Sequence, residues 1–179
     1  KIDEHTLCAI SQANGESLWQ YTAGARIDSP PTVHKGLVVF GGADGWVYCV
    51  RDVDGELVWR YRAAPLDRRT MAYEQLGSLW PVDGSVLIRD GSVWCVAVRS
   101  NFLDGGLRLL RIDLATGEKL SETIMDATNP ATGNNLQEVL QILQMPVGLP
   151  DILSADEHFV YMKSQKFDFE GNRLEIGPN

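Results

Sequence analysis

A short pattern that occurs four times along the chain limits the fold more than any other feature of the sequence. In each copy, apolar residues precede a polar turn with glycine, and two copies continue into a strand that ends in tryptophan. The turn glycines are Gly15, Gly55, Gly117 and Gly171. Because glycine adopts positive φ without a steric penalty, each copy predicts a tight reversal between two strands, a β-hairpin.

A second hairpin pattern precedes three of these turns. Residues 29–50 contain two short apolar runs with a turn between them, and residues 85–98 and 151–164 repeat that arrangement. Two hairpins make four antiparallel strands, which is one blade of a β-propeller. A lone blade cannot bury both of its faces, so successive blades must pack on each other. The sequence therefore predicts an all-β fold, a β-propeller of four-stranded antiparallel blades.

The four turns account for about three to four blades, whereas propellers usually have four to eight. We therefore expect the chain to be part of a larger ring. The alternative is a compact four-bladed ring in which residues 5–19 complete the last sheet. The expected divisions are a partial blade (1–24), a blade (25–62), a blade with long loops (63–124) and a blade with an inserted segment (125–179).

The inserted segment contains one helical pattern. Apolar residues between Leu136 and Leu143 recur at the spacing of one helix face, and Pro146 ends the pattern. We expect a short helix near 136–144 that packs on the propeller edge, with an interaction surface as the alternative.

The charge and hydropathy of the chain exclude two classes of partner. The formal net charge is -8, which opposes binding to a phosphate backbone, so we expect no nucleic acid. No apolar run is long enough for a membrane span. The three cysteines, Cys8, Cys49 and Cys95, each lie in an apolar stretch without clustered ligands. They are interpreted as buried thiols and not as a metal site, with one disulfide as the alternative.

Three stretches carry a resemblance to a known family: Gly42–Gly45, Asp54–Glu56 with Trp59, and Asp113–Glu118. They resemble the pyrroloquinoline-quinone (PQQ)-like repeat of quinoprotein alcohol dehydrogenases and of the outer-membrane assembly lipoprotein propeller. The resemblance covers nearly the whole chain except about 121–148. It is specific for the fold and not for an activity, since both enzymes and scaffolds use this repeat.

Two loops are longer than the repeat requires, Ala63–Val82 and Arg99–Gly106, and the resemblance favours them as the binding region. Arginine pairs grip carboxylate, phosphate or sulfate groups, aromatic rings stack on rings or sugars, and an Arg–Asp pair orders a loop. The alternative is a solvated arginine pair, a core-capping tryptophan and a loop-holding ion pair. The candidate ligand-binding residues are Arg68, Arg69, Tyr73, Trp80, Arg99, Ser100 and Asp104.

No catalytic motif is present, and we predict no catalytic residue, metal site or cofactor. The favoured function is a non-catalytic scaffold or binding module. Its partners would be adjoining blades of the parent chain or of another subunit, and a protein or small-molecule ligand. One alternative is part of a PQQ- and calcium-dependent quinoprotein-type dehydrogenase, although the adjacent cysteine pair of many such enzymes is absent. A second is a glycan-binding module that uses Trp80 and Tyr73. The resemblance implies a periplasmic or secreted location.

Overall fold

A computed structural model describes residues 4–72, 74–100, 106–126, 128, 132–134, 148–150 and 152–174. Within these residues the regular secondary structure consists of strands, and every sheet is antiparallel. The helix predicted near 136–144 lies outside the described residues. The strands are β1 (Thr6–Ile10), β2 (Ser17–Thr22), β3 (Thr32–His34), β4 (Leu37–Gly41), β5 (Trp46–Arg51), β6 (Leu57–Arg62), β7 (Arg69–Ala72), β8 (Gln75–Ser78), β9 (Leu87–Arg89), β10 (Ser92–Ala97), β11 (Leu107–Asp113), β12 (Lys119–Met125), β13 (Leu153–Ala155), β14 (Val160–Met162) and β15 (Gln165–Phe167).

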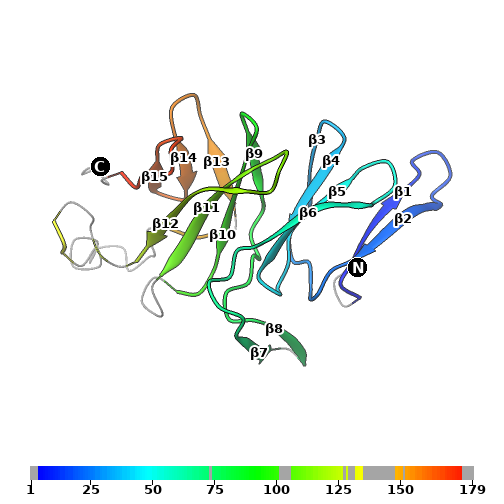
Figure 1. Cartoon of the computed structure of the whole chain (residues 1–179), viewed down its shortest axis with the longest axis horizontal. Helices are drawn as coiled ribbons and strands as arrows, with labels where there is room; N and C mark the ends of the chain where they lie inside the picture. The colour runs from blue at the N-terminus through cyan, green and yellow to red at the C-terminus, as the bar shows by residue number, and fades with distance from the viewer. Residues whose placement is uncertain are drawn as a thin grey trace.

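Apart from the two-stranded β7–β8 sheet, the described residues form four sheets that follow one another in chain order, as Figure 1 shows. We call β1–β2 the first sheet, β3–β6 the second, β9–β12 the third and β13–β15 the fourth. The second and third sheets have the predicted four strands each, in the order of the chain. In the described part of the chain, β1 and β2 pair with each other and not with the fourth sheet. The compact ring closed by residues 5–19 is therefore not what the structure shows.

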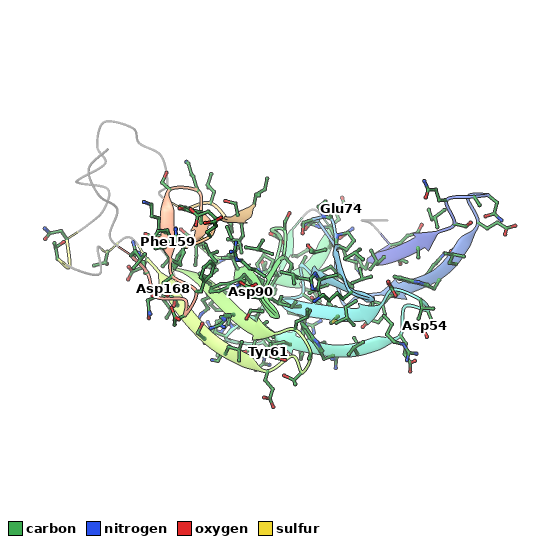
Figure 2. All side chains as sticks on the ribbon, turned by 90° about the horizontal axis from the view of Figure 1, so that it is seen from above. Asp54, Tyr61, Glu74, Asp90, Phe159 and Asp168 are labelled. Atoms are coloured by element: carbon green, nitrogen blue, oxygen red, sulfur yellow. The ribbon has the colours of Figure 1, made fainter. Side chains whose placement is uncertain are left out.

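Buried apolar side chains form a core between each pair of successive sheets. Figure 2 shows the sheets from above, with their side chains as sticks. The alternation along β4 explains how one sheet covers two neighbours, because successive side chains of a strand point to opposite faces. Val38 and Phe40 belong to the core shared with the first sheet, whereas Val39 belongs to the core shared with the third. A third core, around Trp94 and Phe167, joins the third and fourth sheets. Such face-to-face stacking is the packing of propeller blades.

A tryptophan in the outer strand of one blade docks on the turn glycine of the next blade; the prediction that the strand ends at this residue is wrong, since β2 and β6 continue to Thr22 and Arg62. Trp59 donates its indole N–H to the Leu114 carbonyl oxygen at 2.8 Å. A Cβ at Gly117 would lie 2.7 Å from the Trp59 ring, so this glycine permits both the turn and the ring contact. Trp19 packs against Gly55 in the same way. The repeat residues thus join blades as well as forming hairpins.

At the junction between the third and fourth sheets, small hydroxyl side chains take the place of tryptophan. Ser121 stands four residues after Gly117, as Trp59 does after Gly55, and it lies against Gly171. Thr123 donates its hydroxyl to the Gly171 carbonyl oxygen at 2.5 Å. The contact between the outer strand of one blade and the turn glycine of the next is therefore kept at this junction, although no tryptophan takes part in it.

Two predicted turns have the backbone of a two-residue hairpin loop. Lys35 and Gly36 have φ of 46° and 83°, and Asp90 and Gly91 have φ of 47° and 71°. Positive φ at both residues is the type I′ geometry that matches the twist of the flanking strands. The hairpins predicted from these residues are confirmed.

All three cysteines are free thiols, which rules out the disulfide alternative. Cys49 and Cys95 are buried as predicted, and burial raises the pKa of each thiol to about 12. Cys8 is only half-buried, so the prediction of three buried thiols is wrong for this residue. Its strand β1 belongs to a sheet with a described neighbour on one face only, the second sheet. In the part of the chain that the structure describes, no helix has the length and apolar character needed to cross a membrane.

Candidate functional site

The first long loop folds into a hairpin of its own, β7–β8, which stands apart from the blades in Figure 1. Main-chain hydrogen bonds fix it to the second sheet. The Ser78 N–H donates to the Ala43 carbonyl at 2.7 Å, and the Ala43 N–H donates to the Arg26 carbonyl at 2.8 Å. The Leu79 N–H donates to the Arg68 carbonyl at 2.9 Å and closes the base of the hairpin. Backbone hydrogen bonds thus join three segments that are distant in sequence at one end of the second sheet.

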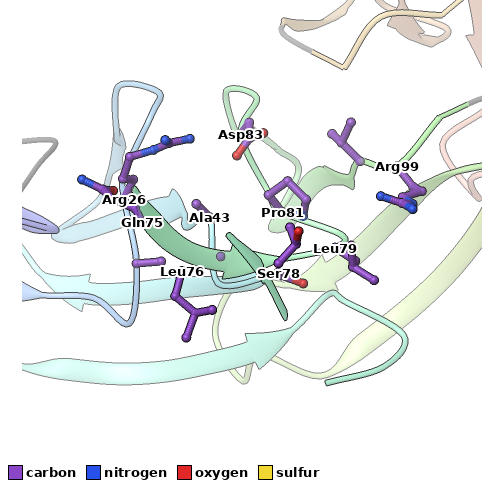
Figure 3. A pocket seen from close by; sticks show the side chains of 13 residues that line it. Arg26, Ala43, Gln75, Leu76, Ser78, Leu79, Pro81, Asp83 and Arg99 are labelled. Carbon is purple, nitrogen blue, oxygen red and sulfur yellow. The ribbon is translucent and has the colours of Figure 1, made fainter. Parts of the chain in front are cut away.

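A pocket of about 330 Å³ lies beneath this hairpin, and we call it the hairpin pocket (Figure 3). Figure 3 shows Arg26 and Arg99 on opposite sides of it, with Asp83 and Pro81 between them. Its walls come from the second sheet, the hairpin and the two long loops. The lining residues are Ala25, Arg26, Ala43, Thr70, Gln75, Leu76, Gly77, Ser78, Leu79, Pro81, Asp83, Val98 and Arg99.

The hairpin pocket combines a few polar groups with an apolar wall. Arg26 forms a two-point ion pair with Asp28, with distances of 3.1 Å from Nε to Oδ1 and from Nη2 to Oδ2. Ser78 Oγ accepts the Trp80 N–H at 3.0 Å, so this hydroxyl is engaged in holding the loop. The lining contains guanidinium, carboxylate and amide groups beside leucine, proline and valine side chains. A few polar groups in an apolar wall orient a ligand or a partner side chain.

A second pocket of about 460 Å³ lies between the end of β2 and the outer strand β6, and we call it the arginine pocket. Three guanidinium groups face it, together with the rings of tyrosine and tryptophan residues. Arg60 lies over the Trp46 ring, with 4.7 Å between Cζ and the ring centre. The lining residues are Tyr21, Thr22, Ala23, Gly24, Asp44, Trp46, Tyr48, Arg60, Arg62, Asp67 and Arg69.

With this geometry in place, comparison with known proteins gives the family. The model of the family described as outer membrane protein assembly factor BamB matches residues 2–166. The chain belongs to the BamB family. A curated relative, the outer membrane protein assembly factor BamB of Burkholderia pseudomallei (strain K96243), is 30% identical over 161 residues. The match covers 89% of this chain and 36% of that protein, so the chain spans about a third of the relative's length.

Solved structures show the same fold for this BamB-family chain. A quinohemoprotein alcohol dehydrogenase from Pseudomonas putida HK5 superposes with a TM-score of 0.65 at 14% identity. That match covers 90% of this chain and 25% of the other. The quinohemoprotein alcohol dehydrogenase from Comamonas testosteroni has a TM-score of 0.56 at 16% identity, over 92% of this chain and 25% of the other. The likeness confirms the propeller-type fold and the resemblance read from the repeats.

The structure divides the candidate residues of this BamB-family chain between two pockets. Arg99 lines the hairpin pocket, and Arg69 lines the arginine pocket, where its Nε lies 3.5 Å from Asp67 Oδ1. Arg68 is exposed and lines neither pocket, and its carbonyl accepts the hydrogen bond at the base of the hairpin. The adjacent pair that was predicted to act as one anion grip is therefore split.

The remaining candidates are a buried tryptophan, a half-buried serine and two residues that lie outside the described part of the chain. Trp80 is 4% exposed and belongs to the core between the second and third sheets, so its ring has no open face for a sugar. Ser100 follows Arg99 and is half-buried. Tyr73 and Asp104 lie outside the described residues. The proposed aromatic pair for glycans therefore retains only Tyr73.

The sequence reasoning missed Arg60, Arg62 and Trp46. The signal was present in β6, where residues 59–62 alternate two aromatic residues with two arginines. Alternate residues share one face of a strand, so both arginines had to lie together. Their partner Trp46 comes from the neighbouring strand, opposite Arg62 in the β5–β6 register.

The quinoprotein alternative requires oxygen ligands for calcium. Among the described residues, no three His, Cys, Asp or Glu side chains lie close enough together to hold a metal ion. Two acidic residues that follow β5 are already paired: Arg51 Nη2 binds Asp54 Oδ2 at 2.6 Å and also pairs with Glu56. The carboxylates of the described residues therefore do not assemble a calcium site, and no chemical step is derived through PQQ.

Proposed function

We propose that this chain is a segment of a non-catalytic propeller that acts as a binding scaffold in outer-membrane protein assembly. Its protein-contacting surface is the β7–β8 hairpin with the pocket beneath it. The name of the Burkholderia relative supports the assembly role, and the same relationship supports the periplasmic one of the two predicted locations. Adjoining blades, from the parent chain or from another subunit, complete the ring.

One observation carries this proposal: an exposed apolar pair on a rigidly held hairpin. Met71 and Leu76 are direct cross-strand neighbours, and they are 74% and 50% exposed. The hairpin projects from the blades, and the backbone hydrogen bond from the Ser78 N–H to the Ala43 carbonyl anchors its base. Apolar side chains that protrude together beside a pocket are typical of a partner-binding surface. Propeller strands supply the scaffold for such loops.

Site-specific photocrosslinking in cells tests the proposal. We expect a photoreactive residue at Met71 to form a covalent adduct with a component or substrate of outer-membrane protein assembly, identified by mass spectrometry. The matched control is Val53, which is 75% exposed in the β5–β6 turn and lies outside the hairpin. The control should give no such adduct. Equal adducts at both sites, or a Met71 partner unrelated to the outer membrane, would contradict the proposal.

The quinoprotein alternative predicts a different result. A ligand present at a hundred times its Kd stabilises a protein by about 2.7 kcal/mol, which is a rise of several degrees in the melting temperature. For this chain we expect PQQ with calcium to leave the melting temperature unchanged in a thermal unfolding experiment. A saturable rise that depends on both PQQ and calcium would favour the dehydrogenase over the scaffold.

A further inference from the structure

We propose that the arginine pocket binds an extended acidic peptide segment whose carboxylates occur at alternate residues and pair with Arg60 and Arg62. This surface is separate from the hairpin pocket, and the inference goes beyond the proposed assembly role. It rests on the orientation of β6, on the charges in the pocket and on the spacing of the two guanidinium groups.

The β6 strand presents two different faces. Trp59 and Tyr61 pack toward the third sheet, in the core that the second and third sheets share. Arg60 and Arg62 therefore point to the opposite face, where both are exposed and line the arginine pocket. Arg60 rests on the ring of Trp46, which orients its guanidinium group. The two cations are held side by side at the outer strand of the sheet.

The acidic groups in the pocket are already engaged. Asp44 accepts the Tyr48 hydroxyl and, through Oδ1, the Trp46 N–H at 3.2 Å. Asp67 lies beside Arg69 at 3.5 Å. In the described part of the chain, neither Arg60 nor Arg62 has a carboxylate within ion-pair distance. Since the whole chain has a net charge of -8, two unpaired cations in one pocket are not a product of a generally basic surface.

The spacing of the cations selects the shape of the ligand. Alternate residues of a strand lie roughly 6.6 Å apart on one face. A peptide that runs alongside β6 places its own alternate side chains at the same interval, about 5 Å across from those of Arg60 and Arg62. Because β6 is the last strand in its sheet, its outer edge has no strand neighbour in the described residues. Carboxylates at alternate positions can then each form a two-point hydrogen bond with one guanidinium.

The test uses the full chain and two labelled peptides of equal composition. In one, glutamate alternates with threonine; in the other, the glutamates are adjacent in one block. We expect fluorescence anisotropy to show tighter binding of the alternating peptide. The R60Q/R62Q variant should bind it about tenfold more weakly or worse, because two charge-assisted pairs are lost. The matched control is R51Q, which removes an exposed arginine at the end of β5, outside the arginine pocket, and should bind normally.

Circular dichroism must show that the double variant is folded, and the single variant R62Q gives a second reading with a smaller expected loss. Equal affinity for both peptides would overturn the proposal, as would unchanged binding by R60Q/R62Q. Competition by inorganic phosphate at concentrations equal to those of the peptide would also overturn it, because the pocket would then be a general anion site. Crosslinking at Met71 is unaffected by these outcomes, so the assembly role and the peptide site fail independently.

Discussion

Replacing Trp59 with alanine is expected to lower the free energy of unfolding by about 3–5 kcal/mol, the usual cost of deleting a buried aromatic ring. Trp59 is 8% exposed in the core between the second and third sheets. The substitution removes the ring contact with Gly117 and leaves the Leu114 carbonyl without its indole donor. Both losses fall on one junction between blades. Urea denaturation followed by circular dichroism measures the change.

The matched control is Trp19→Ala at the junction between the first and second sheets. Trp19 makes the same contact with a turn glycine, Gly55, and donates to the Asp52 carbonyl at 2.8 Å. Its ring is only half-buried, so less apolar surface returns to water and the expected loss is smaller. If both variants lose the same stability, or if Trp59→Ala loses less than about 1 kcal/mol, the tryptophan contact does not hold the blades together.

The blade pattern was readable from sequence because its signals are local. A turn such as Asp90-Gly91 takes two positive φ angles, and the alternation around it follows from the geometry of a single hairpin. The contact of Trp59 with the next blade could not be predicted from such local signals. Its partner Leu114 lies in the next blade, and the intervening loops vary in length. The repeat pattern placed the tryptophan in a strand, although β6 continues past it to Arg62, and it carries no signal for the surface that receives the ring.

The site was harder to predict because its loop residues take their environment from docking. Arg68 and Arg69 are neighbours in sequence. At the start of β7, however, the Arg69 side chain lines the arginine pocket, whereas the Arg68 side chain lines neither pocket. Trp80 follows the hairpin, and the hydrogen bond between Ser78 and Ala43 carries it into the core. Neither the placement of Arg69 nor that of Trp80 follows from a periodic pattern in the sequence. The alternating arginines Arg60 and Arg62 did have one, since strand periodicity alone places them on one face.

Replacing Gly45 with alanine is expected to cost about 2–5 kcal/mol and to loosen the hairpin. The residue has φ of 83°, where an alanine costs about 1–2 kcal/mol. A Cβ there would lie 2.6 Å from the Cβ of Ala64 and 2.9 Å from Ser78 Oγ and from the Trp80 carbonyl oxygen. Forcing a methyl group into such a contact adds about 1–3 kcal/mol. The Gly45 carbonyl also accepts the N–H groups of Ala63 and Ala64, at 2.9 and 3.0 Å, so the strain falls on the segment that leads into the hairpin.

The variant Gly91→Ala separates the backbone cost of Gly45→Ala from the cost of crowding. Gly91 has φ of 71°, but no atom lies within 4 Å of the site that a Cβ would occupy, so this variant has the backbone cost alone. Chemical denaturation should place Gly45→Ala about 1–3 kcal/mol below Gly91→Ala, the difference being the cost of crowding. Limited proteolysis should then cut Gly45→Ala faster within β7–β8, because the crowded atoms belong to the base of that hairpin. Equal stability of the two variants would show that Ala64, Ser78 and Trp80 move aside freely, and the hairpin would then not be the rigid platform that partner binding requires.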